Sequence, residues 1–137
     1  MNGLMMNMQL SIASIVEHAE RINGDVEIVS VMGDKPRHRY TYREAFARTR
    51  KLSDSMALWG LEQGDRIATL AWNDYRHFEI YYAAACSGYV CHTINPRLFP
   101  EQLAYIINHA EDRYVCIDPD FVSLAESLVD QCPTVQG

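Results

Sequence analysis

Short apolar runs alternate with amphipathic stretches through the second half of this sequence. The runs cover 66–72, 89–93 and 114–117, and the first lacks strict alternation, which indicates a strand covered on both faces. Stretches 75–87 and 100–110 carry apolar residues at helical spacing. Strands and helices that alternate in this way pair in parallel through right-handed crossovers. The sequence therefore predicts an α/β fold with a mostly parallel sheet and helices on both faces.

A helix and a small hairpin are expected ahead of these units. Apolar side chains follow one helical face over residues 12–22, and Ser14 with Glu17 fits a capping box. Apolar residues near 26–31 predict a strand, and a Gly-Asp-Lys-Pro turn predicts that 37–40 returns beside it as a second strand. We therefore expect a small N-terminal hairpin.

Two more helices complete the pattern. Thr41 and Glu44 fit a capping box at the start of a helix over 42–59. A last helix is expected over 121–128, and residues 134–136 resemble the start of another strand. Because the sequence stops within that expected strand, we predict that it is a fragment of a longer chain.

The composition is that of an ordinary globular domain, with 48% hydrophobic and 22% charged residues. We divide it into an N-terminal arm and helix, 1–25, and an incomplete α/β subdomain, 26–137. A net charge of -6 with scattered basic residues argues against nucleic acid as a partner, which requires clustered Lys and Arg. No apolar run approaches the ~20 residues of a membrane span. Four cysteines without CxxC spacing favour a reducing, cytoplasmic location.

Ligands of a parallel α/β sheet collect beyond the carboxyl ends of its strands. Three polar residues at these positions are more simply helix caps or strand terminators: Asn73, Asp74 and Asp118. The segment Asn95-Pro96-Arg97 is a better candidate, because Pro96 holds Asn95 extended and leaves Arg97 exposed at the edge of the sheet. An exposed guanidinium there suits a phosphate. A structural turn explains the same three residues equally well.

Other chemistry has little support in the sequence. The glycines are isolated at turns, so no phosphate-binding loop is expected. Cys86, Cys91 and His92 are close in sequence but lack a fourth ligand, so no metal site is expected. No Ser-His or Cys-His pair suggests a nucleophile, and hence no catalytic residue is assigned. The remaining histidines are expected on solvated faces: His18, His38, His77 and His109.

Several of these segments resemble one enzyme family. They are Tyr40-Thr41-Tyr42-Arg43-Glu44, Gly64-Asp65-Arg66-Ile67-Ala68, Trp72-Asn73 and His92-Thr93-Ile94-Asn95-Pro96-Arg97-Leu98. In this order and spacing they are similar to the N-terminal portion of the adenylate-forming (AMP-binding) enzyme superfamily. The Asn-Pro-Arg-Leu sequence, followed by residues 104–112, resembles the medium- and long-chain fatty acyl-CoA synthetase branch. The resemblance implies part of the large N-terminal domain of such a ligase.

The resemblance also implies a reaction for the complete enzyme. Family members activate a carboxylic acid, here expected to be a fatty acid, with ATP and magnesium, and transfer the acyl group to coenzyme A. AMP and pyrophosphate are the other products. The glycine-rich loop, the acidic adenylate-binding motif and the C-terminal lysine of the family have no counterpart in this sequence. The chain alone is therefore expected to be inactive and to need none of these cofactors.

Two more expectations come from the resemblance. The loop that aligns with Asn95, Pro96 and Arg97 lies near the coenzyme A entrance in related synthetases, so these residues are candidate contacts for the adenine or phosphate end. Some long-chain members form a homodimer through the N-terminal segment, and the Met-rich arm with helix 12–22 is expected to do so here.

Two readings outside enzyme chemistry are also possible. A small α/β binding domain, such as a phosphoacceptor receiver, needs a carboxylate cluster at one strand end and a lysine at another. Here single acids stand at Asp74 and Asp118, and the only lysines are Lys35 and Lys51. An oligomerisation module without catalytic activity is the other reading, because an incomplete sheet leaves an open edge that favours association.

Overall fold

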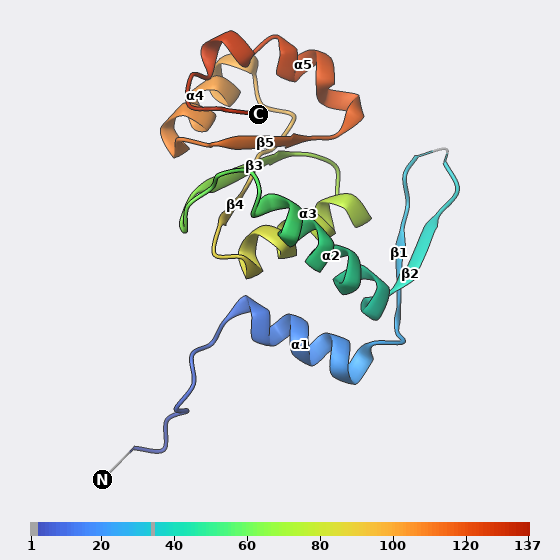
Figure 1. Ribbon diagram of the computed structural model, residues 1–137. Coiled ribbons are helices and arrows are strands. Elements are labelled where there is room, and N and C mark those ends of the chain that lie inside the picture. Colours follow the sequence, from blue (N-terminus) through green and yellow to red (C-terminus); the bar gives the residue numbers. More distant parts are fainter. Residues whose placement is uncertain (1–2, 34) are drawn as a thin grey trace.

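A three-stranded parallel sheet lies at the centre of the protein (Figure 1). The structure, a computed structural model, gives the strand order β4-β3-β5 and a separate antiparallel hairpin of β1 and β2. The strands are β1 (Glu27–Ser30), β2 (His38–Thr41), β3 (Arg66–Leu70), β4 (Val90–Thr93) and β5 (Tyr114–Ile117). The predicted fold class is confirmed, including the parallel pairing and the small hairpin.

Helices cover both faces of the parallel sheet, and Figure 1 shows α2 and α3 on the side opposite α4 and α5. α1 packs against α2 and α3 on their outer side. The α-helices are α1 (Ile12–Asn23), α2 (Tyr42–Met56), α3 (Tyr75–Cys86), α4 (Pro100–Ala110) and α5 (Val122–Glu126). Two 3-10 helices flank α5: η1 (Pro119–Phe121) and η2 (Val129–Gln131).

The middle strand explains the apolar run that lacks alternation. Ile67 and Ala68 are consecutive residues of β3, and both are fully buried. Ile67 packs on one face with residues of α2 and α3: Met56, Ala83 and Ala84. Ala68 packs on the other face with residues of α4: Leu103, Ala104 and Ile107. Successive side chains of a strand point to opposite faces, so a helical layer on each face requires apolar residues at every position.

Helix α2 begins as predicted and ends three residues earlier. The Thr41 hydroxyl accepts from the Glu44 amide at 3.3 Å, and the Glu44 carboxylate accepts from the Thr41 amide at 2.8 Å. The predicted end at residue 59 is wrong because the chain leaves the helix after Met56. Gly60 then turns the chain with φ of +73°, a conformation that favours glycine.

The capping box predicted at Ser14 and Glu17 is wrong. Helix α1 begins at Ile12, the start of the predicted helical face, so Ser11 is the cap and accepts from the Ser14 amide at 3.3 Å. Both serines precede apolar residues at suitable spacing, and the sequence does not distinguish them.

The end of the chain is less regular than predicted. The expected helix over 121–128 is divided among η1, α5 and η2. The predicted strand at 134–136 is not regular, although that segment lies beside β5. The Gln136 amide donates to the Arg113 carbonyl at 2.8 Å, and the Val115 amide donates to the Gly137 carbonyl at 3.0 Å.

The structure describes residues 3–33 and 35–137. Met1 and Asn2 of the predicted arm, and Asp34 of the predicted hairpin turn, lie outside the described residues. Within the described ranges, no helix combines the length and apolar character needed to cross a bilayer.

Candidate functional site

The carboxyl ends of the parallel strands meet a cleft of about 500 Å³. Its walls come from the segments that follow β3 and β4, together with the first turn of α3. Asn95, Pro96 and Arg97 all line this cleft, beside Trp72 and Asn73. The structure therefore brings the predicted candidate residues to the expected edge of the sheet.

The loop over 95–97 is a tight turn with an exposed cation. The Asn95 side chain accepts from the Arg97 amide at 3.0 Å, which fixes the turn. Arg97 itself is exposed, and no hydrogen bond or ion pair joins its guanidinium to any residue in the described ranges. The arrangement leaves a positive charge available to an anion that enters the cleft. Its role in binding stays a prediction.

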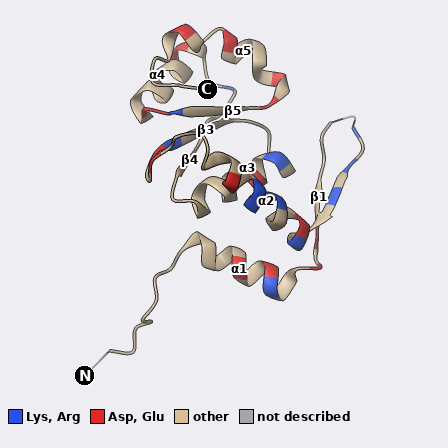
Figure 2. Cartoon of the chain, in the orientation of Figure 1, with Lys and Arg blue, Asp and Glu red and all other residues tan. Residues whose placement is uncertain are grey.

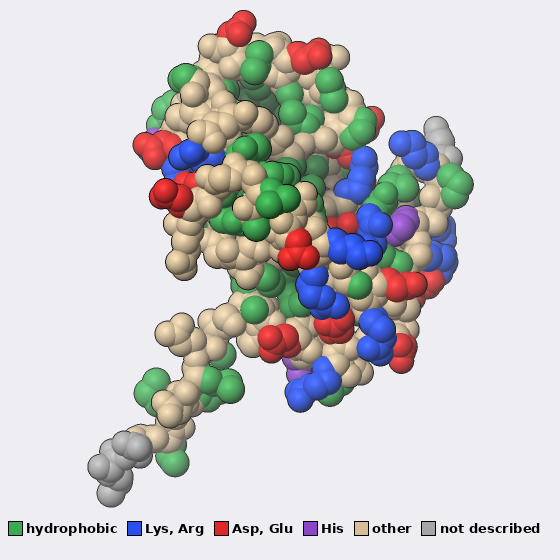
Figure 3. All heavy atoms as spheres, in the orientation of Figure 1, with side chains coloured by type: hydrophobic (Ala, Val, Ile, Leu, Met, Phe, Trp, Pro, Cys, Tyr) green, Lys and Arg blue, Asp and Glu red, His purple; other side chains and the backbone are tan. Residues whose placement is uncertain are grey.

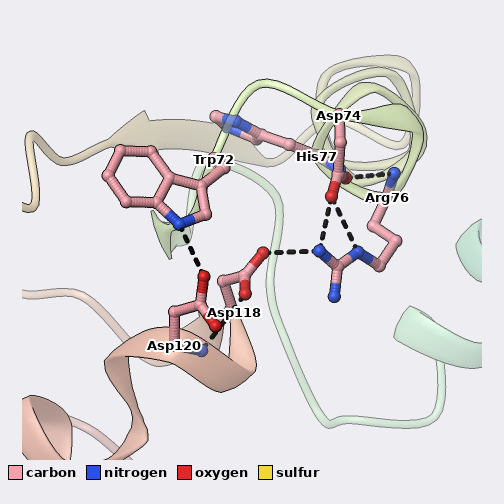
Figure 4. Close-up of polar contacts among 6 residues, drawn as sticks. All are labelled: Trp72, Asp74, Arg76, His77, Asp118 and Asp120. Atoms are coloured by element: carbon pink, nitrogen blue, oxygen red, sulfur yellow. Dashed lines mark hydrogen bonds and ion pairs between the residues drawn. The ribbon is translucent and has the colours of Figure 1, made fainter. Parts of the chain in front are cut away.

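An arginine joins the segments that follow β3 and β5, as Figure 4 shows. Asp74 caps α3 and accepts from the Arg76 amide at 2.8 Å. The Arg76 guanidinium binds the Asp74 carboxylate and also the Asp118 carboxylate, the latter at 2.6 Å. The two acidic side chains are only 4% and 6% exposed. Arg76 therefore holds together two buried carboxylates that come from different strand ends.

The cap predicted at Asp74 is confirmed, and so is the cap at Asp118, whose side chain accepts from the Asp120 amide at 3.2 Å. The link through Arg76 was not foreseen. Burial of Asp74 opposes ionisation, but hydrogen bonds from Arg76 outweigh it and lower the pKa of this carboxyl. The same hydrogen bond raises the pKa of Arg76. Both groups are therefore charged in the folded protein at neutral pH.

Trp72 forms one wall of the cleft, and two residues of η1 contact its side chain. Its indole N–H donates to the Asp120 carboxylate at 3.0 Å. Its ring lies 4.8 Å from the Phe121 ring, centroid to centroid. Even so, 41% of Trp72 is exposed. The sequence offered this residue only as part of a family motif.

His77 and His38 are not on solvated faces, so those two predictions are wrong. His77 is half-buried at the cleft, with Nε2 2.9 Å from the Thr69 hydroxyl, and burial lowers its pKa. His38 is half-buried and stacks on Tyr75 at 3.8 Å between centroids. In both contacts the two residues are too far apart in the sequence for a local pattern to predict that they meet.

His92 has an acidic partner on the α4 side of the sheet. Its Nδ1 lies 2.7 Å from the carboxylate of Asp112, which is fully buried. Burial raises the pKa of Asp112, and the His92 contact opposes that shift only in part. Over residues 3–33 and 35–137, no three His, Cys, Asp or Glu side chains are placed to hold a metal ion. The contact joins β4 to the turn that follows α4.

The sequence family follows from comparison with known proteins. A family model described as AMP-binding enzyme matches residues 16–136. The chain belongs to the AMP-binding enzyme family. The predicted family is thereby confirmed, and the reading as a receiver domain is set aside.

Relatives in this family are CoA ligases by name. The chain is 50% identical over 136 residues to the 3-methylmercaptopropionyl-CoA ligase of Ruegeria lacuscaerulensis, covering 99% of the chain and 25% of the relative. It is 47% identical over 137 residues to the medium-chain-fatty-acid CoA ligase of Ectopseudomonas oleovorans, covering 100% and 25%. The chain thus spans about a quarter of the length of these AMP-binding relatives, in agreement with the predicted partial ligase.

A solved structure supports the fold. The N-terminal domain of FACL13 from Mycobacterium tuberculosis superposes with a TM-score of 0.83 at 21% identity, covering 93% of this chain and 32% of that one. At this identity the likeness concerns the fold alone. The parallel sheet of this AMP-binding chain and its two helical layers therefore have the same architecture as that N-terminal domain.

Proposed function

We propose that this chain is the N-terminal part of an ATP-dependent acyl-CoA synthetase. The complete enzyme converts a carboxylic acid, ATP and coenzyme A into acyl-CoA, AMP and pyrophosphate. The observation that carries the proposal is the 50% and 47% identity to CoA ligases over practically the whole chain. In this enzyme the described residues supply scaffold and one wall of a cofactor site.

The cleft at the carboxyl edge fits one end of coenzyme A. Coenzyme A supplies the thiol that accepts the acyl group, and its far end carries phosphates and an adenine. Arg97 offers a guanidinium for phosphate, and the exposed amide of Asn95 lies in the same loop. We therefore propose Asn95, Pro96 and Arg97 as coenzyme A contacts, with Pro96 shaping the turn.

ATP and magnesium do not fit the residues of this chain. The sequence has no glycine-rich phosphate loop. No three-residue cluster suited to a metal occurs in the part of the chain that the structure describes. Both groups are therefore assigned to the other three quarters of the enzyme, and the chain by itself should not activate an acid.

Acid-dependent exchange of pyrophosphate into ATP tests this assignment of roles. The complete ligase should catalyse the exchange with fatty acids and form acyl-CoA when coenzyme A is added. The 137-residue chain should do neither. Exchange by the isolated chain, or a complete ligase inert toward every carboxylic acid tried, would contradict the proposal.

Replacing Arg97 with alanine should weaken coenzyme A binding. Loss of one charge-assisted phosphate contact costs about 1.5 kcal/mol, so the KM for coenzyme A should rise about tenfold. The matched control is Arg37→Ala, which removes an exposed arginine that does not line the cleft. The rate of pyrophosphate exchange needs no coenzyme A and should stay unchanged in both variants. A normal KM for coenzyme A in Arg97→Ala would remove this residue from the site.

Two further proposals concern the acid that the complete ligase activates and the location of the ligase in the cell. Relatives are named for medium-chain fatty acids, long-chain fatty acids and 3-methylmercaptopropionate, so we propose aliphatic acids of the fatty-acid class as substrates of the complete ligase. Reaction with aryl acids alone in the exchange assay would contradict this. The four cysteines are free thiols, which favours a cytoplasmic location. Recovery of the ligase in the membrane or secreted fraction would contradict that location.

The N-terminal arm is proposed to form a homodimer contact. Residues 3–10 are exposed and extend away from the body of the protein in Figures 1 and 3. Their apolar side chains include Leu4, Met5, Met8 and Leu10, and α1 also exposes Ile15. Exposed apolar groups in such number favour association. We retain 1–25 as the associating segment and 26–137 as the α/β subdomain.

Light scattering tests whether the N-terminal arm forms the homodimer contact. The complete ligase should be a dimer, and a variant that lacks residues 1–10 should be a monomer at the same concentration. As a control, Met5→Ala with Met8→Ala keeps the length of the arm but removes apolar surface, and it should weaken the dimer. A dimer that persists without the arm would place the interface elsewhere.

A further inference from the structure

The indole of Trp72 is the largest exposed apolar group in the wall of the cleft. It lies two residues after β3, and the Asp74 amide donates to its carbonyl at 2.9 Å. The backbone at this position is therefore ordered by the cap of α3. Tryptophan is on average a largely buried residue, and 41% of Trp72 is exposed in this chain. Trp72 lines the cleft, so this surface faces any ligand that enters it.

The ring of Trp72 is held in one orientation. Asp120 accepts its N–H, and Phe121 packs beside it, both within η1. Figure 4 shows that η1 is itself connected to α3 by the ion pair of Arg76 with Asp118. A side chain fixed in advance loses little conformational entropy when it binds a ligand. The indole is thus suited to act as a rigid binding surface.

The cleft combines three kinds of group that together fit a nucleotide. The indole offers an aromatic face on which a base can stack. Arg97 offers a cation for phosphate, and the exposed amides of Asn73 and Asn95 can hydrogen bond to the edge of a base. An acyl chain would use the indole only, and a free phosphate would use the arginine only. A phosphorylated purine nucleoside uses all of them.

We propose that Trp72 is the stacking surface for the adenine ring of coenzyme A and makes the ligase prefer a thiol that carries a nucleotide. The inference rests on the proposed function, in which the loop over 95–97 contacts the same end of coenzyme A. Trp72 follows β3, whereas the loop over 95–97 follows β4. In this proposal Trp72 contacts the adenine base, and the loop contacts the phosphates. Asp120 and Phe121 position the indole and do not contact the ligand.

The test compares two acceptor thiols in the complete ligase. Coenzyme A carries the nucleotide, whereas 4′-phosphopantetheine carries the same thiol without it. In Trp72→Leu, which keeps an apolar group against Phe121, the KM for coenzyme A should rise about tenfold, because stacking on one base is worth about this factor. The KM for phosphopantetheine and the kcat with saturating thiol should stay within about twofold of wild type.

Three further variants separate stacking from folding. Trp72→Phe keeps an aromatic face, so the KM for coenzyme A should return to within about threefold of wild type. Asp120→Asn removes the charged acceptor of the indole N–H, so the KM for coenzyme A should rise about threefold with no change for phosphopantetheine. Trp59→Phe changes the other tryptophan, which stacks on Tyr114 away from the cleft, and should leave both KM values unchanged.

The outcomes distinguish this inference from the proposed function. A KM for coenzyme A in Trp72→Leu equal to that of wild type overturns the inference and leaves the proposed function intact. Equal increases for both thiols, or no recovery in Trp72→Phe, also overturn it, since they show a structural role. A wild-type ligase that forms no acyl-CoA with either thiol overturns the proposed function itself. Thermal melting of each variant shows which of them retain the fold.

Discussion

Alanine in place of Arg76 is expected to destabilise the chain by about 3 kcal/mol. The change removes one cation from two carboxylates, Asp74 and Asp118, that are nearly inaccessible to water. An uncompensated buried charge costs far more than the original pair contributes. Arg76 is itself 35% exposed, so some water can reach the site, and the expected loss lies at the lower end for such pairs.

Urea unfolding of wild type and Arg76→Ala measures this loss. The matched control is Arg43→Ala, because Arg43 pairs with Asp25 at 3.2 Å where the two side chains are 60% and 92% exposed. An exposed ion pair typically contributes about 0.5 kcal/mol to the free energy of unfolding, so the control variant should be almost as stable as wild type. Equal losses in the two variants would show that burial of the Asp74 carboxylate does not decide the effect.

The loss in Arg76→Ala should also depend on pH. The pKa of Asp74 is lowered in the folded protein, mainly because Arg76 hydrogen bonds overcome the effect of burial. A carboxyl with a lowered pKa adds stability that is complete above its unfolded pKa of about 3.9 and is lost as pH falls through the folded value. The difference between variant and wild type should therefore be complete at neutral pH and shrink in acid below that pKa.

Local patterns in the sequence predicted most of the fold. A strand over 66–72 was foreseen because burial on two faces requires apolar residues at consecutive positions, as Ile67 and Ala68 show, although β3 ends at Leu70. The cap at Thr41 was foreseen because both partners of a capping box lie within four residues. Ser11 was missed because Ser14 satisfies the same pattern one turn later.

The site was predicted less completely, because its contacts join distant residues. The loop over 95–97 could be placed at the carboxyl edge of the sheet because it directly follows a predicted parallel strand in the sequence. By contrast, Arg76 and Asp118 are 42 residues apart, and Trp72 and Asp120 are 48 apart. Such pairs depend on which strands become neighbours, here β3 and β5, and no local spacing encodes that choice.

The other large effect is expected at the centre of the sheet. Changing Ile67 to alanine should lower the free energy of unfolding by about 3 kcal/mol, since the side chain is fully buried and its removal leaves a cavity. Val90→Ala in β4 is the matched control, because Val90 is 48% exposed and should cost less than about 1 kcal/mol. Urea unfolding of both variants measures the difference.

This comparison also tests whether the two helical layers form in the 137 residues alone. Ile67 is already fully buried within this chain, in a cluster with residues of α2 and α3, so its full cost should appear in the 137 residues alone. If the layers instead assemble only in the complete enzyme, the isolated chain would unfold without a cooperative transition, and the two variants would be indistinguishable. A clear difference between Ile67→Ala and Val90→Ala would establish that these 137 residues specify the scaffold under the cleft.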